Sequence, residues 1–244
     1  MMQHDSVRGT CTIFWKERRE WAGARQRKHS GWLNTLVLVA LVGGLLPDQL
    51  KPVWTTSWIP IFVAMWVMFY RVANTIADSV AGERERHTLE SLVSTPLPSQ
   101  AIVWGKIMAA VVSAAPAMLL AMTVALGTSN GYTLIHPWHV YTVAVMVGIV
   151  LDGVLAGVLA AGAGMWISVK SRTTRHAQQT LSGLSLLLWF LPIGVNRALH
   201  GSLTSPQHLQ HLGWVVIGVS AGLSLIGGVA VFMAQRSLRH LSGC

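Results

Sequence analysis

Three carboxylates and a run of apolar side chains gather in one polar stretch, residues 82–106, which separates two long apolar runs. Glu83 and Glu90 are seven residues apart, so they share one face of a helix two turns apart, whereas Glu85 is offset from both. Leu89 and the apolar residues after it form an adjoining ridge. An acidic edge beside an apolar ridge suits a groove with basic rims on a partner protein. The alternative is an ordinary loop with a short amphipathic helix.

Asp152 is the only acidic residue well inside an apolar run of the sequence. A carboxylate inside a membrane is costly and is therefore a functional candidate by default. Asp152 is accordingly a candidate for the lining or the gate of a translocation path. The alternative is a structural carboxylate, either protonated or hydrogen-bonded to a neighbouring helix.

Two pairs of histidines have a spacing that suits metal binding, His136 with His139 and His208 with His211. Side chains three residues apart can share one face of a helix and bind one metal ion. Of the acidic residues and cysteines, only Asp48 falls on the same side of the membrane in the topology given below. We therefore expect no metal site, and we expect these histidines to lie at the membrane interface or in water.

The sequence carries no nucleotide-binding loop of the P-loop type. Gly105 and Lys106 are followed by Ile107 rather than by Ser or Thr, and no glycine-rich loop precedes them. The net charge of +9 would suit nucleic acid, but the location of the charge matters more than its sum. We therefore expect neither an ATP site nor a nucleic-acid partner for this chain, and we do not expect it to be an enzyme.

The elements that position these residues are expected to be membrane-spanning helices. Apolar residues make up 52% of the chain and charged residues only 11%, far below the quarter that is typical of a soluble domain. A span needs about 20 mostly apolar residues to cross roughly 30 Å of hydrocarbon. The sequence thus predicts an all-α polytopic membrane protein with six transmembrane helices. The six runs lie at residues 32–47, 53–77, 101–127, 139–167, 179–196 and 212–234.

The basic residues set the orientation of these spans. All Lys and Arg residues except Lys51 and Arg197 fall in the two terminal segments or in the regions 71–106 and 168–178, which lie on the same side as the termini. Cytoplasmic segments of membrane proteins carry the excess of Lys and Arg. Both termini and the polar stretch are therefore predicted to be cytoplasmic in a multi-pass protein of the cell membrane.

This topology divides the chain into three segments. The N-terminal one is basic, with Phe14 and Trp21 among the charges, and a helix of this kind lies in the membrane interface. A solvated basic tail is the alternative. The segments are a cytoplasmic interfacial helix at 1–31, a six-helix transmembrane domain at 32–234 with a coupling segment at 79–100, and a cytoplasmic tail at 235–244.

The polar stretch resembles the signature of the ABC-2 type family of ABC transporter permeases. It departs from the family pattern at His87, where the family usually has glycine. Lys16, Glu17 and Arg18 are similar to the interfacial helix of such permeases, which implies that Phe14, Lys16, Glu17 and Trp21 belong to this helix and that it takes part in docking the ATPase. The positions that match in order and spacing are Glu83, Glu85, Thr88, Leu89, Glu90, Leu92, Pro96, Gly105 and Lys106.

This resemblance implies a function, partners and cofactors. The chain would be the permease subunit of an ATP-driven exporter in a prokaryotic plasma membrane, paired as a dimer with a second copy or a paralogue. ATP and Mg²⁺ would bind to a separate cytosolic ATPase subunit. The resemblance also implies a re-entrant outer hairpin at 192–211, between the fifth and sixth spans. A cytoplasmic coupling helix between the second and third spans would dock the ATPase through Glu83, Glu85, His87, Thr88, Leu89, Glu90, Leu92 and Pro96.

Two other functions stay open on the residues alone. A secondary carrier or channel without a motor would need ionisable residues grouped within the membrane, and Asp152 stands by itself in the sequence. A membrane anchor that transports nothing would need only the spans and a partner-binding segment.

Overall fold

The computed structural model describes residues 9–19, 29–55, 57–85, 98–131, 140–171, 173–198 and 212–242. Every regular element in these ranges is a helix, so the predicted all-α class is confirmed for the part of the chain that is described. An N-terminal helix covers residues 9–19. It is followed by α2 (His29–Val39), the π-helix η1 (Ala40–Leu45), α3 (Leu46–Trp54), α4 (Ile59–Glu85), α6 (Ser99–Asn130), α7 (Val143–Lys170), α8 (Thr174–Ala198) and α9 (Leu212–Ser242).

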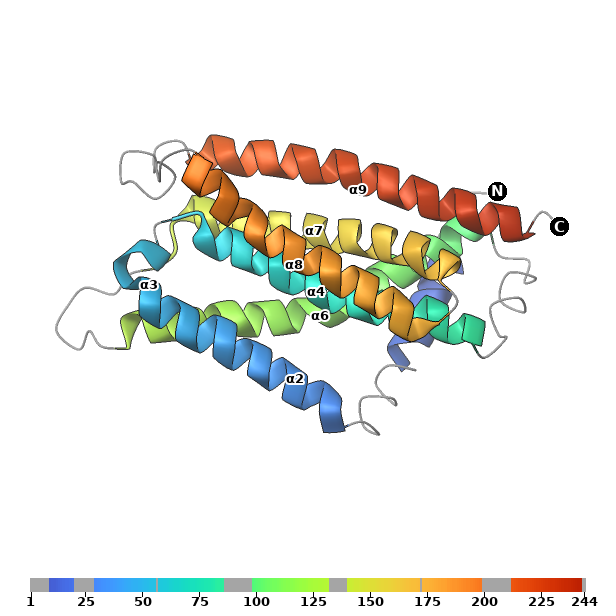
Figure 1. Ribbon diagram of the computed structural model, residues 1–244, viewed down its shortest axis with the longest axis horizontal. Helices are drawn as coiled ribbons and strands as arrows, with labels where there is room; N and C mark the ends of the chain where they lie inside the picture. Colours follow the sequence, from blue (N-terminus) through green and yellow to red (C-terminus); the bar gives the residue numbers. More distant parts are fainter. Residues whose placement is uncertain are drawn as a thin grey trace.

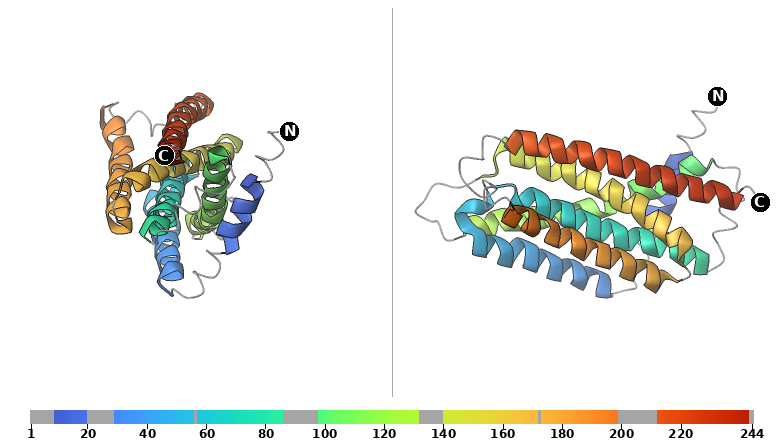
Figure 2. Two further views of the ribbon diagram at one scale, coloured as in Figure 1. Left: turned by 90° about the vertical axis from the view of Figure 1, so that its right-hand side faces the viewer. Right: turned by 45° about the horizontal axis from the view of Figure 1, so that its top comes forward.

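The long helices lie side by side in one elongated bundle (Figure 1). The end-on view of Figure 2 places α4 and α7 in the middle, with α2, α6, α8 and α9 around them. The most extensive packing joins α4 to α7 and α7 to α9. The face of α4 in this core contains Ala64, Val67, Met68, Val72, Ile76 and Ala77, none of which exposes any surface.

The bundle has two distinct ends, which we name after a residue near each. The Lys106 end holds the N-terminal helix, the last turn of α4, the first turns of α6 and α8, and the end of α9 (Figures 1 and 2). At the opposite, Tyr141 end, the Trp54 indole N–H donates to the Tyr141 hydroxyl (3.0 Å), which donates to the Met122 carbonyl (3.1 Å). These bonds hold the end of α3 against α6 and the start of α7.

Five helical segments in the described part are long and apolar enough to cross a membrane. Large apolar side chains also cover the outside of the bundle, among them Val147 and Val150 on α7 and Phe232 on α9. A soluble protein of this size would bury such side chains, whereas lipid accepts them. The chain is therefore a multi-pass helical membrane protein. The five segments are Leu33–Leu50, Ile59–Glu83, Gln100–Asn130, Val143–Lys170 and Gly218–Ser237.

These segments correspond to all the predicted runs except 179–196. That run lies within the helix α8, whose side chains are described only as far as Leu186. Helix α9 continues to Ser242, so most of the segment that was predicted as a tail after residue 234 is helical.

The second predicted run, 53–77, differs at both ends from the helix that contains most of it. Its first residues belong to α3 and to the turn after it, and α4 begins only at Ile59. Helix α4 then continues to Glu85, so the first residues of the expected coupling segment are the last turns of this span. Hydropathy ends a run at the first charges, whereas the helix continues through Asp78 and Glu85, and both of these residues have hydrogen-bond partners on α8.

The π-helix η1 shows how an irregular backbone is accommodated in a span. A π-helical turn frees a carbonyl from the regular hydrogen-bond pattern, and a free carbonyl in lipid is costly. The Thr128 hydroxyl of α6 donates to the Gly43 carbonyl at 2.6 Å. A Cβ at Gly43 would lie 2.9 Å from the Ala121 carbonyl oxygen, so glycine is what lets the two helices approach this closely.

Several predicted features lie outside the described residues. They are Trp21, the docking residues His87, Thr88, Leu89, Glu90, Leu92 and Pro96, the histidines His136, His139, His208 and His211, and the part of the expected outer hairpin after Ala198.

Candidate functional site

The N-terminal helix packs against the start of α6 at the Lys106 end (Figure 2). Gly9, Ile13 and Glu17 are buried, and they are four residues apart, so they form one face of this helix. A Cβ at Gly105 would lie only 2.8 Å from Ile13, so a larger residue there would push the helix away. The glycine of the Gly-Lys pair therefore allows the contact that the following Lys106 uses.

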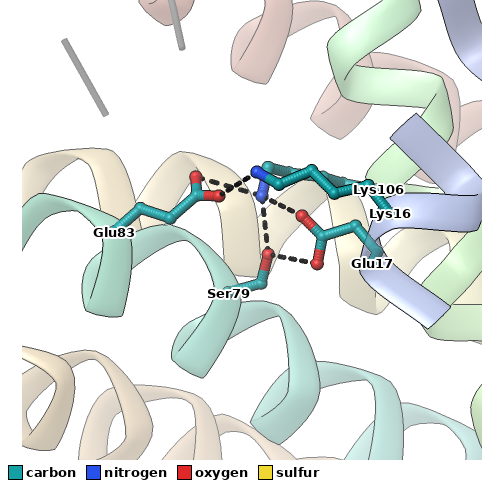
Figure 3. Close-up of polar contacts among 5 residues, drawn as sticks. All are labelled: Lys16, Glu17, Ser79, Glu83 and Lys106. Carbon is teal, nitrogen blue, oxygen red and sulfur yellow. Dashed lines mark hydrogen bonds and ion pairs between the residues drawn. The ribbon is translucent and has the colours of Figure 1, made fainter. Parts of the chain in front are cut away.

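Lys106 is the centre of a buried charge cluster that joins three helices (Figure 3). Its ammonium group lies 2.5 Å from Glu17 Oε1, 2.8 Å from Ser79 Oγ and 3.1 Å from Glu83 Oε2. The contacts to Glu17 and Ser79 are hydrogen bonds that the ammonium group donates, whereas the contact to Glu83 is an ion pair. The Ser79 hydroxyl in turn donates to Glu17 Oε2 at 3.2 Å. We call Glu17, Ser79, Glu83 and Lys106 the Lys106 cluster.

Acidic and basic side chains alternate in this cluster, and a further ion pair connects it to Lys16 at the protein surface. Glu17 and Lys106 are each only 2% exposed, so their charges are almost completely removed from water. Glu83 is 15% exposed and also lies 3.6 Å from Lys16, whose side chain is 43% exposed. Removing one partner of a buried ion pair leaves an uncompensated charge, so the loss of a single member of this cluster should be costly. The N-terminal helix is thus fastened to α4 through Ser79 and Glu83, and to α6 through Lys106.

The exposed side of the N-terminal helix is basic and aromatic. The Arg18 guanidinium lies over the rings of Phe14 and Trp15, at 5.8 and 5.5 Å from their centroids. Trp15 is 53% exposed. Of the residues assigned to the interfacial helix, Phe14 and Lys16 lie on this side, whereas Glu17 points into the protein. Its spacing of four residues from Ile13, which is itself four residues from Gly9, places it on the packed face.

A second set of contacts at this end joins α4 to α8. Glu85 Oε1 accepts hydrogen bonds from the backbone N–H of Thr174 at 2.7 Å and from its hydroxyl at 3.0 Å. Two turns earlier on α4, Asp78 Oδ1 accepts from the Gln178 side-chain amide at 2.7 Å. Both carboxylates of the Glu-x-Glu pattern, Glu83 and Glu85, therefore have partners within the chain.

Asp152 lies in the middle of α7 and is completely buried. Its Oδ1 accepts a hydrogen bond from the Ser220 hydroxyl of α9. The next residue, Gly153, is covered by the thioethers of Met68 and Met118, so the helix is closely packed here. This is the contact that the structural interpretation of Asp152 expects. A role in the translocation path stays a prediction.

Clusters of side chains that could bind a metal ion are absent from the described residues. No three His, Cys, Asp or Glu side chains come close enough there to bind one metal ion. The predicted histidine pairs lie outside this part of the chain.

The pairing of Glu17 with Lys106 and Ser79 was missed by the sequence analysis. The signal was present: a lysine within a long apolar run needs a counter-charge. The sequence offered several acidic candidates, however, and only the path of the N-terminal helix selects Glu17.

The apolar spans and the internal charge pairs define an all-helical, multi-pass membrane protein. The profile of the ABC-2 family transporter proteins matches residues 47–237, more than half of the chain. The chain therefore belongs to the ABC-2 family of transporter proteins, the membrane components of ABC transporters, and the resemblance seen in the polar stretch is confirmed. The comparison with curated proteins found no match.

Proposed function

We propose that this chain is the permease subunit of an ATP-driven exporter in a prokaryotic plasma membrane. Six helices would span the membrane, with α8 as the fifth span, and the Lys106 end would face the cytoplasm. ATP and Mg²⁺ would bind to a separate ATPase subunit, and a second copy or a paralogue would complete the translocation path.

The Lys106 cluster is the observation that supports this proposal best. The polar stretch connects the end of α4 to the start of α6, and the cluster joins these same two helices to each other and to the N-terminal helix. A partner that pushes on residues 86–97 would therefore push on a braced group of helices rather than on a loose loop. Such bracing is what transmission of an ATP-driven movement requires.

The residues of the signature would therefore have two different roles, internal contacts and docking. Glu83 and Glu85 bind Lys106 and Thr174 of the same chain, and these contacts fix the end of α4. Docking on the ATPase would then depend on the residues that follow, above all Leu89 and Glu90, together with His87, Thr88, Leu92 and Pro96. The acidic edge that the ATPase meets would be Glu90, with Leu89 as the apolar contact beside it.

A carrier driven by ions is the competing function, and it would need a chain of ionisable groups through the membrane. Asp152 is the candidate for such a group. In the described part of the chain its hydrogen-bond partner is the neutral Ser220. This contact favours a structural role and so favours the ATP-driven function.

The test is co-purification of the permease with an ABC ATPase encoded by a neighbouring reading frame. We expect Leu89→Asp to abolish binding, because it places a charge in the apolar contact. We expect Glu90→Ala to weaken binding by about 2–5 kcal/mol if this carboxylate is desolvated at the interface. The conservative variants Leu89→Met and Glu90→Asp, which keep the apolar contact and the charge, are the matched controls and should retain most of the binding.

Membrane insertion and ATP hydrolysis complete the test. All four variants should insert as the wild type does, and the permease should change the ATPase rate only where it binds. If the ATPase fails to bind the wild type, or binds Leu89→Asp equally well, the proposed docking function is wrong.

A further inference from the structure

The seam between α4 and α8 is held by hydrogen bonds at three levels. At the Lys106 end, Glu85 binds Thr174. Further along, Asp78 accepts from Gln178. Towards the middle of the bundle, the Trp66 indole N–H donates to the carbonyl of residue 185 at 3.1 Å. The two helices run in opposite directions, so each level joins a later part of α8 to an earlier part of α4.

Glu85 completes the first turn of α8. The first N–H groups of a helix have no partner within the helix. Thr173 provides one partner, because its hydroxyl accepts from the backbone N–H of His176 at 3.3 Å. Glu85 provides another by accepting from the N–H of Thr174. A carboxylate is favoured at this position because the N-terminus of a helix carries a partial positive charge.

Close packing lies beneath these bonds. Ala177 and Leu181 of α8 are buried in the core together with Ile76 of α4. Helix α8 packs much more extensively against α4 than against α7. The half of α8 at the Lys106 end therefore packs mainly against α4.

We propose that Glu85 and Asp78 are positioning residues that make α8 follow α4, so that a movement begun in residues 86–97 reaches the fifth span. Glu85 is the last residue of α4, and the docking segment begins immediately after it. A displacement there acts on Thr174 through two hydrogen bonds before it passes further along α4. The source of the movement rests on the proposed function, whereas the coupling of α4 to α8 does not.

The coupling is tested first on the permease alone, in lipid nanodiscs, by hydrogen–deuterium exchange of the peptide that covers residues 173–181. Glu85→Ala should accelerate exchange in this peptide by about 2- to 5-fold, the range expected for an exposed charged contact. The combined variant Glu85→Ala/Asp78→Ala should accelerate it further. Glu85→Gln keeps an acceptor oxygen and should show a smaller change, and Gln179→Ala, on the exposed side of α8, should show none. Unchanged exchange in the combined variant would overturn the proposal.

The second measurement follows movement in the permease–ATPase complex. Spin labels at Thr180 on α8 and Met108 on α6 report their separation, after Cys11 and Cys244 are replaced by serine. Trapping with Mg·ATP and vanadate should shift this distance in the otherwise wild-type protein. The shift should fall by at least half in Glu85→Ala/Asp78→Ala, although this variant still binds the ATPase. An equal shift in both would refute the coupling.

The two measurements separate this inference from the proposed function. If no ATPase binds, the proposed function fails, and the exchange experiment still decides whether α4 holds α8. If the ATPase binds and the exchange rate of the α8 peptide is the same in the wild type and in Glu85→Ala/Asp78→Ala, the proposed function stands and the coupling is wrong.

Discussion

Removal of the Lys106 ammonium group should be one of the most destabilising single changes at this end of the bundle. Lys106→Met keeps most of the side-chain volume but removes the contacts to Glu17, Ser79 and Glu83. Two carboxylates then face each other without the charge between them. Glu17 is only 2% exposed and cannot turn to water without moving the N-terminal helix.

The size of the effect follows from this burial. Breaking a buried ion pair by removing one partner costs about 3–5 kcal/mol. Lys16→Met is the matched control, since Lys16 also pairs with Glu83 but its side chain is 43% exposed. An exposed pair contributes about 0–1 kcal/mol. The two lysine variants should therefore differ by at least about 2 kcal/mol.

Unfolding by SDS titration in mixed micelles measures the difference, and cleavage by trypsin after Arg19 reports release of the N-terminal helix. The combined variant Glu17→Leu/Lys106→Met removes both buried charges of the closest pair. It should regain at least half of the stability lost by Lys106→Met, because replacing a whole buried pair by apolar residues is often neutral. Glu83 keeps Lys16 as a partner in this variant.

Two results would refute this reasoning. One is a loss for Lys106→Met as small as that for Lys16→Met. The other is strict additivity of Glu17→Leu and Lys106→Met, since residues in contact should show a coupling energy of about 0.5–3 kcal/mol.

Three further predictions follow from the packing and the topology. Gly105→Leu should expose the N-terminal helix to trypsin at concentrations that leave the wild type intact, because a Cβ at this position would already lie 2.8 Å from Ile13. Gly105→Ala should show a weaker effect. Equal resistance of Gly105→Leu and the wild type to trypsin would contradict the packing. A cysteine at Gly131 should react with an impermeant thiol reagent in intact cells, whereas one at Thr173 should react only after permeabilisation; the opposite pattern would reverse the topology. Ser220→Ala should lower stability by about 0.6 kcal/mol and at most about 1.7 kcal/mol, as measured by SDS titration; no loss would show that its bond to Asp152 contributes nothing.

Composition and hydropathy were enough to predict the class of fold and most of the spans. These signals depend on averages over about 20 residues and survive local irregularity. They failed where a single partner decides the structure. The end of α4 is an example, because Glu85 belongs to the helix and accepts a hydrogen bond from Thr174, a residue far away in the sequence.

The candidate site was predictable in its location but not in its contacts. The signature residues marked the polar stretch, and the structure places Glu83 and Lys106 at the two helices that it connects. The partner of Lys106 was not predictable, because the spacing of charges in one sequence does not reveal how the N-terminal helix crosses α6. The sequence assigned Glu17 to an interfacial helix without revealing that its side chain is almost completely buried.

The distance along the chain between Glu17 and Lys106 sets an order of events during synthesis. The two residues are 89 positions apart. At about 5–20 residues per second, roughly 4–18 s pass between their exits from the ribosome. During this interval the N-terminal helix has no buried counter-charge to bind, and it waits at the membrane surface while the first spans insert. Docking of the N-terminal helix is therefore a late assembly step, because it requires the start of α6. It completes the Lys106 end of the bundle after the first spans have inserted.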